Sequence, residues 1–343
     1  MKETVLVTGG AGYIGSHTAV ELIQAGFDVV IADNLSNSDL QAVEGVRRIT
    51  SAEVPFEQID CCDLQAMRRL FERHEFRSVI HFAASKAVGE SVAEPLKYYR
   101  NNLLSFLNVV ELMCDFGRPN ILFSSSCTVY GEPDAQPVTE QTPRKPATSP
   151  YGNTKQISED ILRDAVAAHP GLRGIALRYF NPIGSHPSAL IGELPRGVPQ
   201  NLVPYVTQTA AGIRECLSIF GNDYPTPDGT CIRDYIHVTD LADAHVRVLK
   251  YLAEGGESQY FNLGSQNGFS VREMIEAAKK VTGKDFKVEE APRRAGDPAI
   301  LIAGSEKIRR VTGWQPTHSK VEQIIADAWN WHQHHPQGYG DKK

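Results

Sequence analysis

Short apolar runs alternate with amphipathic helical patterns along the first half of the chain. The apolar runs cover residues 5–7, 29–32, 78–82, 120–123 and 174–179, and the helical patterns cover residues 17–25, 103–114 and 156–168. Alternation of this kind is typical of parallel strands joined by crossover helices. The pattern therefore predicts an α/β fold built on a doubly wound parallel sheet, the Rossmann arrangement.

The composition of the sequence changes at about residue 181. Residues 182–201 and 221–230 are rich in proline and glycine, and long irregular loops of this kind usually carry binding function. We expect residues 1–180 to form the Rossmann domain and residues 181–343 to form mainly a smaller α/β domain that binds substrate. An apolar run at 260–263 predicts that a segment around 235–265 returns to the first domain.

Length and composition narrow the class of protein. The chain has 343 residues, enough for two domains, and a net charge of −6. Its basic residues are scattered, which argues against a nucleic-acid partner. Six irregularly placed cysteines fit reduced thiols in the cytosol, and no apolar stretch approaches membrane-spanning length. Because the first apolar run lies so near the N-terminus, we expect no signal peptide and a cytoplasmic protein.

The segment TGGAGYIGSH comes directly after the first apolar run and carries Gly9, Gly12 and Gly15 at three-residue intervals. Glycine is needed where a chain turns sharply off a strand and where its backbone approaches a pyrophosphate, and the next helix would direct its N–H groups at the phosphates. Asp33 ends the second apolar run about twenty residues further on. In dinucleotide-binding folds a carboxylate at this position accepts hydrogen bonds from the ribose hydroxyls and repels a 2′-phosphate. Because residues 34–38 contain no arginine to counter that repulsion, the sequence favours NAD over NADP.

Tyr151 and Lys155 lie four residues apart in the run SPYGNTK. On a helix this spacing puts both side chains on one face, so the ammonium can approach the phenol. A phenol ordinarily has a pKa of about 10, and adjacent positive charge favours the phenolate. The pair alone also fits two surface residues. Downstream of a dinucleotide motif, however, it predicts that Tyr151 is a general base.

Three serines, Ser124, Ser125 and Ser126, come directly after the apolar run at 120–123. Ligands of an open parallel sheet bind at the carboxyl ends of its strands, so we expect these hydroxyls near the nicotinamide end of the cleft. A hydroxyl there would share the substrate's proton with Tyr151, although serines also end strands for structural reasons alone. The sequence has no nucleophile elbow, metal-ligand spacing or P-loop, so no metal site is expected.

Further motifs are spread over nearly the whole chain. They are TGGAGYIGSH, DNLSNS, HFAASKAVGES, FSSSCTVYG, SPYGNTK, LRYFNPIG, NLVPY, IFGNDYPTPDGT, IRDYIHVTDLA and HPQGY. Together they resemble the UDP-glucose 4-epimerase family of the extended short-chain dehydrogenase/reductase superfamily. The resemblance includes the second domain, so it implies more than a shared cofactor fold.

The resemblance implies roles for individual residues. In the family the position of Tyr151 is the base, that of Lys155 binds the nicotinamide ribose and tunes the base, and that of Ser126 bonds the 4-hydroxyl of the sugar. These three positions would also line NAD, together with Gly9, Gly12, Tyr13, Ile14, Gly15, Asp33, Asn34, Asn37, Ser38, Asp60, Cys61, Phe82, Ala83, Lys86, Asn101, Tyr179 and Phe180. Besides Ser126 and Tyr151, the positions that would contact a UDP-sugar are Asn181, Asn201, Leu202, Phe220, Arg233, Arg294, Asp297 and Leu301.

The resemblance also implies a reaction. UDP-glucose and UDP-galactose would be interconverted by oxidation at C4 with NAD, rotation of the 4-keto sugar and return of hydride to its opposite face, as a step of galactose and nucleotide-sugar metabolism. Because the cofactor ends as it began, we expect it to be held tightly. The family further suggests a homodimer, formed by the helical stretches at 103–114 and 156–168, although their apolar stripes also fit a core.

Three alternatives stay open at this point. Related sugar-nucleotide 4,6-dehydratases carry an Asp-Glu pair after the active-site threonine, whereas here Thr128 is succeeded by Val129 and Tyr130, which disfavours dehydration. The second alternative is another nucleotide-sugar epimerase, including one for a carboxylate-bearing sugar. The third is a non-catalytic NAD-binding sensor. Sensors often lose the tyrosine or the lysine of the catalytic pair, and both are present.

Two positions depart from the commonest family pattern. Leu301 stands where some members have a tyrosine that narrows the sugar pocket, so UDP-N-acetylglucosamine and its galacto epimer are candidate substrates, unless neighbouring side chains refill the space. Ser85 stands where an apolar residue is common, and the sequence offers no account of it.

Overall fold

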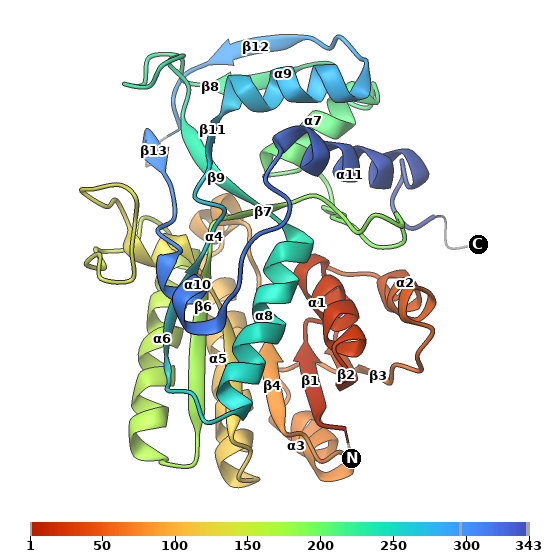
Figure 1. Ribbon diagram of the computed structural model, residues 1–343, viewed down its shortest axis with the longest axis vertical. Helices are drawn as coiled ribbons and strands as arrows, with labels where there is room; N and C mark the ends of the chain where they lie inside the picture. The colour runs from red at the N-terminus through yellow and green to blue at the C-terminus, as the bar shows by residue number, and fades with distance from the viewer. Residues whose placement is uncertain (1, 295–296, 341–343) are drawn as a thin grey trace.

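The computed structural model describes residues 2–294 and 297–340. A seven-stranded sheet forms the larger lobe, and a smaller lobe lies above the carboxyl ends of its strands (Figure 1). In spatial order the strands are β10 (Gln259–Leu263), β6 (Arg173–Tyr179), β5 (Asn120–Ser126), β4 (Ser78–His81), β1 (Thr4–Thr8), β2 (Asp28–Asp33) and β3 (Phe56–Gln58). Every neighbouring pair is parallel, which confirms the predicted doubly wound sheet.

The order of the strands fixes where a ligand can bind. From β1 the chain adds β2 and β3 on one side and then crosses to add β4, β5 and β6 on the other. The connections on the two sides of β1 therefore leave in opposite directions. Open α/β sheets bind their ligands in the crevice at this switch point, outside the carboxyl ends of the strands.

Helices cover both faces of the sheet because its central strands are apolar on both sides. In β1, Val5 and Val7 face one hydrophobic cluster and Leu6 faces the other, and all three are fully buried. The first face carries α1 (Tyr13–Gln24), α2 (Leu40–Thr50), α8 (Val238–Ala253) and the short α10 (Glu306–Thr312). The second carries α3 (Leu64–Arg73), α5 (Pro95–Asp115) and α6 (Pro150–Ala168), and α4 (Val88–Ala93) packs against α5 and α6.

Three helices begin earlier than the apolar periodicity predicted, and α5 is one of them, since it begins at Pro95 rather than at residue 103. Helix α1 begins at Tyr13, directly after the glycine turn, rather than at residue 17. Helix α6 begins at Pro150, where the Ser149 hydroxyl accepts a hydrogen bond from the Gly152 N–H at 3.1 Å. Tyr151 therefore lies in the first turn of α6, at the end that meets the crevice.

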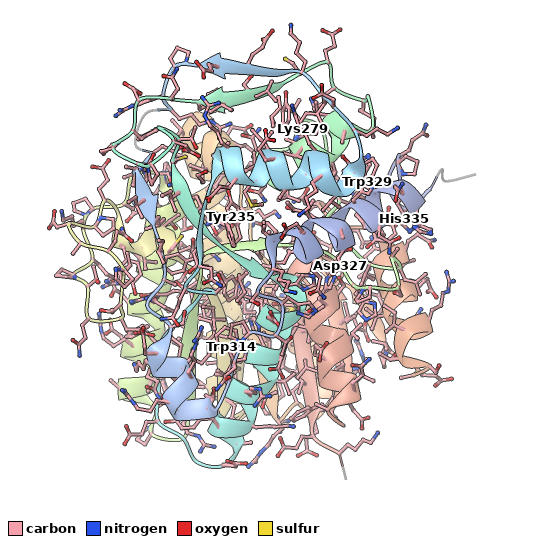
Figure 2. The ribbon with its side chains drawn as sticks, turned by 45° about the horizontal axis from the view of Figure 1, so that its top comes forward. Tyr235, Lys279, Trp314, Asp327, Trp329 and His335 are labelled. Carbon is pink, nitrogen blue, oxygen red and sulfur yellow. The ribbon has the colours of Figure 1, made fainter. Side chains whose placement is uncertain are left out.

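The smaller lobe is a mixed sheet packed against three helices. Strand β9 (Ile232–His237) pairs with β7 (Asn181–Ile183), β11 (Gly268–Ser270) and β13 (Ile300–Leu301); β8 (Leu217–Phe220) pairs with β12 (Val288–Ala291); the helices are α7 (Leu202–Ala210), α9 (Val271–Thr282) and α11 (Val321–His334). Tyr235 of β9 is buried among these helices, and Figure 2 shows Asp327, Trp329 and His335 along α11 and its end.

Later parts of the chain return to the larger lobe. Strand β10 pairs with β6, and Trp314, just after α10, is fully buried and donates its indole N–H to the Asp240 carbonyl of α8 at 2.9 Å. The chain thus crosses between lobes more than once after residue 180, and the division at that residue stays a prediction. Within the described residues, no helix has both the length and the apolar character needed to cross a membrane.

Candidate active site

The glycine turn after β1 leaves room for a ligand's phosphates because its positions admit no side chain. Gly9 has φ +69°, and a Cβ there would lie 2.7 Å from the Ala83 amide nitrogen. A Cβ at Gly15 would lie 2.4 Å from the Gly9 carbonyl oxygen. Helix α1 begins at this turn without a side-chain cap or an acidic residue in its first turn. Its N-terminal N–H groups thus suit the pyrophosphate of a dinucleotide.

Asp33 ends β2 beside this turn and is 7% exposed. One carboxylate oxygen accepts from the Ala11 N–H at 3.1 Å, and the other accepts from the Leu35 N–H at 2.9 Å and the Ser38 hydroxyl at 2.7 Å. An ionised carboxylate has acceptor capacity beyond these three bonds, so Asp33 fits a ribose diol. Asn34 joins this loop to the one after β3 by donating to Asp60 at 3.3 Å.

An arginine from a distant part of the sequence lies beside this loop, although residues 34–38 themselves contain none. Arg196, from the loop before α7, donates to the carbonyl oxygens of Ser36 and Ser38, both at 2.7 Å, and of Leu35 at 3.2 Å. The sequence argument considered only residues 34–38, whereas the fold brings in a side chain about 160 positions away. The acceptors are backbone carbonyls, so the arginine holds the loop.

The loop after β4 is held by two adjacent asparagines of α5. Asn102 accepts from the Ser85 N–H at 2.8 Å and donates to the Ser85 carbonyl at 3.0 Å, while Asn101 donates to the Ser85 hydroxyl at 3.4 Å. This explains the polar residue at position 85, because its hydroxyl and backbone anchor the loop. Lys86, next in that loop, lies 3.5 Å from the Glu193 carboxylate and over the Tyr13 ring.

Tyr151, Lys155 and Ser126 converge at the carboxyl end of β5. The Lys155 ammonium donates to the Ser124 carbonyl at 2.6 Å and lies 5.7 Å from the centroid of the Tyr151 ring. Ser126 is 8% exposed and accepts a hydrogen bond from the Thr128 N–H at 3.2 Å, and its hydroxyl lies close enough to the Tyr151 phenol to lower the pKa of that phenol. The three side chains named from sequence are therefore neighbours at the crevice, as an acid–base site requires.

Burial governs the ionisation of this group. It raises the pKa of Tyr151 to about 12, although the neighbouring Ser126 hydroxyl opposes the rise. It also lowers the pKa of Lys155 to about 7, against the attraction of the Glu159 charge. Loss of hydration thus has the largest effect on the pKa of both groups, and the expectation that the lysine primes the phenol stays a prediction for the protein with its cofactor bound.

Tyr179 and Phe180 are buried behind the crevice. The Tyr179 hydroxyl lies 2.5 Å from Nε2 of His245, whose Nδ1 is 2.8 Å from the Leu241 carbonyl. A carbonyl partner requires the proton on Nδ1, so Nε2 accepts and the tyrosine donates. Phe180 packs in a small cluster with Cys127 and partly buried Leu301. The polar group of Tyr179 thus faces α8, so any contact of this pair with a cofactor involves ring or backbone atoms.

The smaller lobe provides a second pocket rich in arginine. Arg233 pairs with Asp297 at 2.9 Å, and the Arg294 guanidinium lies 4.0 Å from the centroid of the Phe220 ring. A cavity of about 430 Å³ adjoins them, lined by Glu132, Pro133, Tyr224, Arg293, Arg294, Asp297 and Pro298. Planar guanidinium groups suit a diphosphate. The sequence did not predict that Tyr224 and Arg293 line this cavity, because residues in irregular loops show no periodic pattern.

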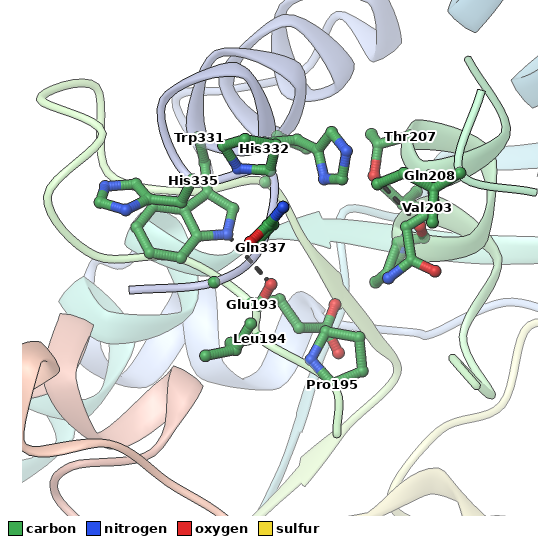
Figure 3. A pocket seen from close by; sticks show the side chains of 16 residues that line it. Glu193, Leu194, Pro195, Val203, Thr207, Gln208, Trp331, His332, His335 and Gln337 are labelled. Atoms are coloured by element: carbon green, nitrogen blue, oxygen red, sulfur yellow. Dashed lines mark hydrogen bonds between the residues drawn. The ribbon is translucent and has the colours of Figure 1, made fainter. Parts of the chain in front are cut away.

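Two predicted sugar-site amides are bound to protein groups. Asn181 donates to the Asp234 carbonyl at 2.8 Å, and Asn201 donates to the Glu193 carboxylate at 2.8 Å. Glu193 therefore links Asn201 to Lys86, and it was missed because it lies in an irregular loop. Figure 3 shows this stretch beside α7 and α11, where it borders a cavity of about 200 Å³.

The remaining predicted residues lie around these features. Ile14 packs on the first hydrophobic cluster, Phe82 faces His245, Cys61 is buried, Asn37 is exposed, Leu202 begins α7, and Leu301 lies opposite Arg233 in the pairing of β13 with β9. Their contacts with a cofactor or a sugar stay predictions.

A doubly wound sheet with a glycine turn, a buried carboxylate at the end of the second strand and a Tyr–Lys–Ser group defines a dinucleotide-dependent protein of the short-chain dehydrogenase/reductase class. A sequence model of the family described as GDP-mannose 4,6 dehydratase matches residues 6–328. Among curated proteins, the UDP-glucose 4-epimerases of Bacillus subtilis (strain 168) and Dictyostelium discoideum are each 49% identical to this chain. The alignments cover 98% of this chain and 98% of the first relative, and 99% of both chains for the second.

A solved relative has nearly the same fold. The crystal structure of UDP-glucose 4-epimerase from Bifidobacterium longum, in complex with NAD+ and UDP, matches with a TM-score of 0.94 and 44% identity. The match covers 98% of this chain and 100% of that one. This chain belongs to the UDP-glucose 4-epimerase family, and it is an enzyme of that family.

Proposed function

We propose that this enzyme interconverts UDP-glucose and UDP-galactose by transient oxidation at C4, with NAD as its cofactor. The observation that carries the proposal is the meeting of Tyr151, Lys155 and Ser126 at the end of β5, between the glycine turn and the arginine-lined pocket. Family membership at 49% identity over nearly the whole chain supports it.

The residues suit the two halves of such a reaction. Tyr151 takes the proton from O4 of the sugar and later returns it, while Ser126 bonds the same oxygen and keeps it near the phenol. Lys155 adds positive charge on the cofactor side. When bound, NAD supplies a hydride acceptor for C4 and a positive ring that favours the phenolate. This charge matters because burial alone holds the pKa of Tyr151 at about 12.

Epimerisation also needs a firm hold on UDP and a loose hold on the hexose. Arg233 and Arg294 would grip the diphosphate, with Asp297 orienting the first and the Phe220 ring lying against the second. The other proposed sugar-site contacts are Asn181, Asn201, Leu202 and Leu301. This division of roles allows the 4-keto sugar to rotate while the nucleotide stays bound.

The dehydratase alternative is disfavoured by the two residues directly after Thr128. Val129 and Tyr130 are fully buried, and the Tyr130 hydroxyl donates to Asn262 at 2.6 Å and accepts from Arg178 at 2.8 Å. Neither residue can serve as the acid or the base that elimination of water requires.

Replacement of Tyr151 by phenylalanine tests the assigned base. Tyr151→Phe should lower turnover of UDP-galactose by at least about a hundredfold, the usual contribution of a general base. The matched control is Tyr251→Phe on α8, whose hydroxyl bonds Glu257 and Gln259 away from the crevice and whose loss should leave turnover unchanged. Equal activity in wild type and Tyr151→Phe would refute the base, and no activity in either would favour a sensor.

The same incubation, extended to UDP-glucose and both N-acetylated analogues with product separation, tests pocket breadth. We propose that Leu301 leaves space for an N-acetyl group, because it is smaller than the tyrosine that some family members have at this position. Absence of N-acetylated turnover beside normal UDP-galactose turnover would remove this broader activity and leave the main proposal standing.

We also propose that the enzyme works as a homodimer in the cytoplasm. Its six cysteines are all free thiols, which fits a reducing compartment. Exposed apolar side chains on α4 and α5 support a contact between two copies.

A further inference from the structure

We propose that Arg196 is a positioning residue that retains the dinucleotide, by tethering the loop between β7 and α7 to the ribose-facing loop after β2. This inference rests on the proposed use of NAD. Arg196 makes no predicted contact with the cofactor. It acts on Leu35, Ser36 and Ser38, whose conformation sets the surroundings of Asp33.

Two residues of the ribose-facing loop, Leu35 and Ser38, form hydrogen bonds with both Asp33 and Arg196. Leu35 donates its N–H to one Asp33 oxygen at 2.9 Å, and its carbonyl accepts from Arg196 at 3.2 Å. Ser38 donates its hydroxyl to the same Asp33 oxygen at 2.7 Å, and its carbonyl accepts from Arg196 at 2.7 Å. Arg196 thus bonds the same two residues that bond the carboxylate facing the ribose.

The loop needs such a tether because its backbone is strained. Leu35 has φ +58°, in the left-handed region that side chains other than glycine, asparagine and aspartate rarely adopt. The hydrogen bonds on its N–H and its carbonyl hold it there. Without the guanidinium, three neighbouring carbonyl oxygens lose their shared cation, and the loop can relax away from the geometry in which Asp33 meets a ribose.

The other end of the tether is firmly fixed, so that Arg196 can transmit this hold. Upstream, the Glu193 carbonyl accepts from the Trp331 indole N–H at 3.1 Å, as the dashed line in Figure 3 shows. Ile191 is fully buried, and Gly45 of α2 approaches it so closely that a Cβ there would lie 2.6 Å from its side chain. The loop between β7 and α7 thus rests on α2 and α11, and Arg196 extends from it to the cofactor edge.

The planar fork of arginine is required for this geometry. Its two terminal nitrogens reach three carbonyl oxygens at once, whereas a lysine ammonium is a single point on a flexible stem. Substitution should therefore speed cofactor release even when the positive charge is kept.

The test measures exchange of bound NAD in the purified holoenzyme against an excess of labelled NAD. Wild type should keep its dinucleotide. R196M should exchange it about tenfold faster or more, because this is the usual effect of losing one charge-assisted hydrogen bond. The exchange rate of R196K should be close to that of R196M. The matched control is R247Q, because Arg247 is also exposed and pairs with Asp243 on the far part of α8. Its exchange and turnover should equal those of wild type.

Hydrogen exchange supplies a second readout that a general loss of stability would not produce. In R196M the amides of residues 35–38 should exchange faster, while those of β1 and β5 keep their protection. Equal NAD exchange in wild type and R196M, or unchanged protection of residues 35–38, would overturn this inference alone. A wild-type protein without dinucleotide and without turnover would overturn the proposed function and this inference together.

Discussion

Lys155 shows how burial acts on a single residue of the site. Its ordinary pKa of 10.5 falls to about 7 in the folded protein, so between these values the unfolded chain binds a proton that the folded chain does not. A depressed pKa contributes stability that is present above pH 10.5 and is lost as pH falls toward about 7. The catalytic lysine therefore makes the protein less stable at neutral pH than an uncharged residue of its size would.

Replacing Lys155 by methionine should remove this loss of stability. Near pH 7 we expect the free energy of unfolding of Lys155→Met to exceed that of wild type by about 1–3 kcal/mol, since relief of charge burial outweighs one lost hydrogen bond. The difference should shrink toward pH 10, and epimerase activity should be lost. Urea unfolding at both pH values measures this. The control is Lys280→Met, an exposed lysine, and a variant less stable than wild type at pH 7 would contradict the argument.

Sequence spacing was sufficient to predict that Tyr151, Lys155 and Ser126 lie together, because helix geometry and the carboxyl end of a strand place them. It could not predict their ionisation, which depends on how tightly β5, β6 and α6 pack around them. Glu193 and Arg196 were missed for another reason. Both lie in an irregular loop whose position is set by contacts with α2 and α11, and no local pattern encodes such contacts.

At the scale of elements, a buried ion pair joins α6 to the sheet beneath the site. Arg178 of β6 donates to both oxygens of Glu159 at 2.8 and 2.7 Å, and both residues are at most 4% exposed. Ser125 of β5 donates to the same carboxylate at 2.6 Å. These bonds fix the helix that carries the catalytic tyrosine and lysine to the strands that carry the serines.

Breaking this pair from one side should be severe. Glu159→Gln leaves the Arg178 charge buried without its partner, so we expect a loss of about 3–5 kcal/mol in the free energy of unfolding. Replacing both residues by methionine should recover much of it, because no buried charge is then left. Chemical denaturation compares the two variants with Asp160→Asn, which alters the neighbouring ion pairs of Asp160 with Arg144 and Arg163 on the surface and should cost about 1 kcal/mol or less. A Glu159→Gln protein as stable as wild type would show that the pair is dispensable.

The elements themselves were predictable where apolar residues repeat and less so at their ends. The run at 120–123 indicated β5, yet the strand continues to Ser126 because each further residue pairs with β6, up to Tyr179. Helix starts depend on capping by Ser149 and on the turn at Gly12, which periodicity does not detect. Proline- and glycine-rich segments in turn indicated loops but not which side chains they bring to the crevice.

On the scale of the whole molecule, one surface is unusually apolar. Five exposed apolar side chains lie on α4 and α5, and within each helix they recur at spacings of three, four or eight residues. They are Val88 and Val92 on α4 and Leu96, Leu104 and Leu107 on α5, with exposures of 40–76%. Single exposed apolar residues are ordinary, whereas this stripe on two adjoining helices supports the proposed contact between two copies. The stripe includes part of the helix at 103–114 that sequence proposed for dimerisation.

Charge placed in this stripe should separate the proposed dimer. In Leu104→Glu/Leu107→Glu, two carboxylates from each copy would face an apolar surface without partners, which is strongly unfavourable. We expect wild type to sediment at twice the mass of the chain and the variant at the mass of one chain, with its helical content unchanged because both positions face solvent in the single chain. Ile213→Glu, an equally exposed apolar residue after α7 in the other lobe, should remain dimeric. A wild-type protein that sediments as a monomer, or a variant that stays dimeric, would place any contact between copies elsewhere on the surface.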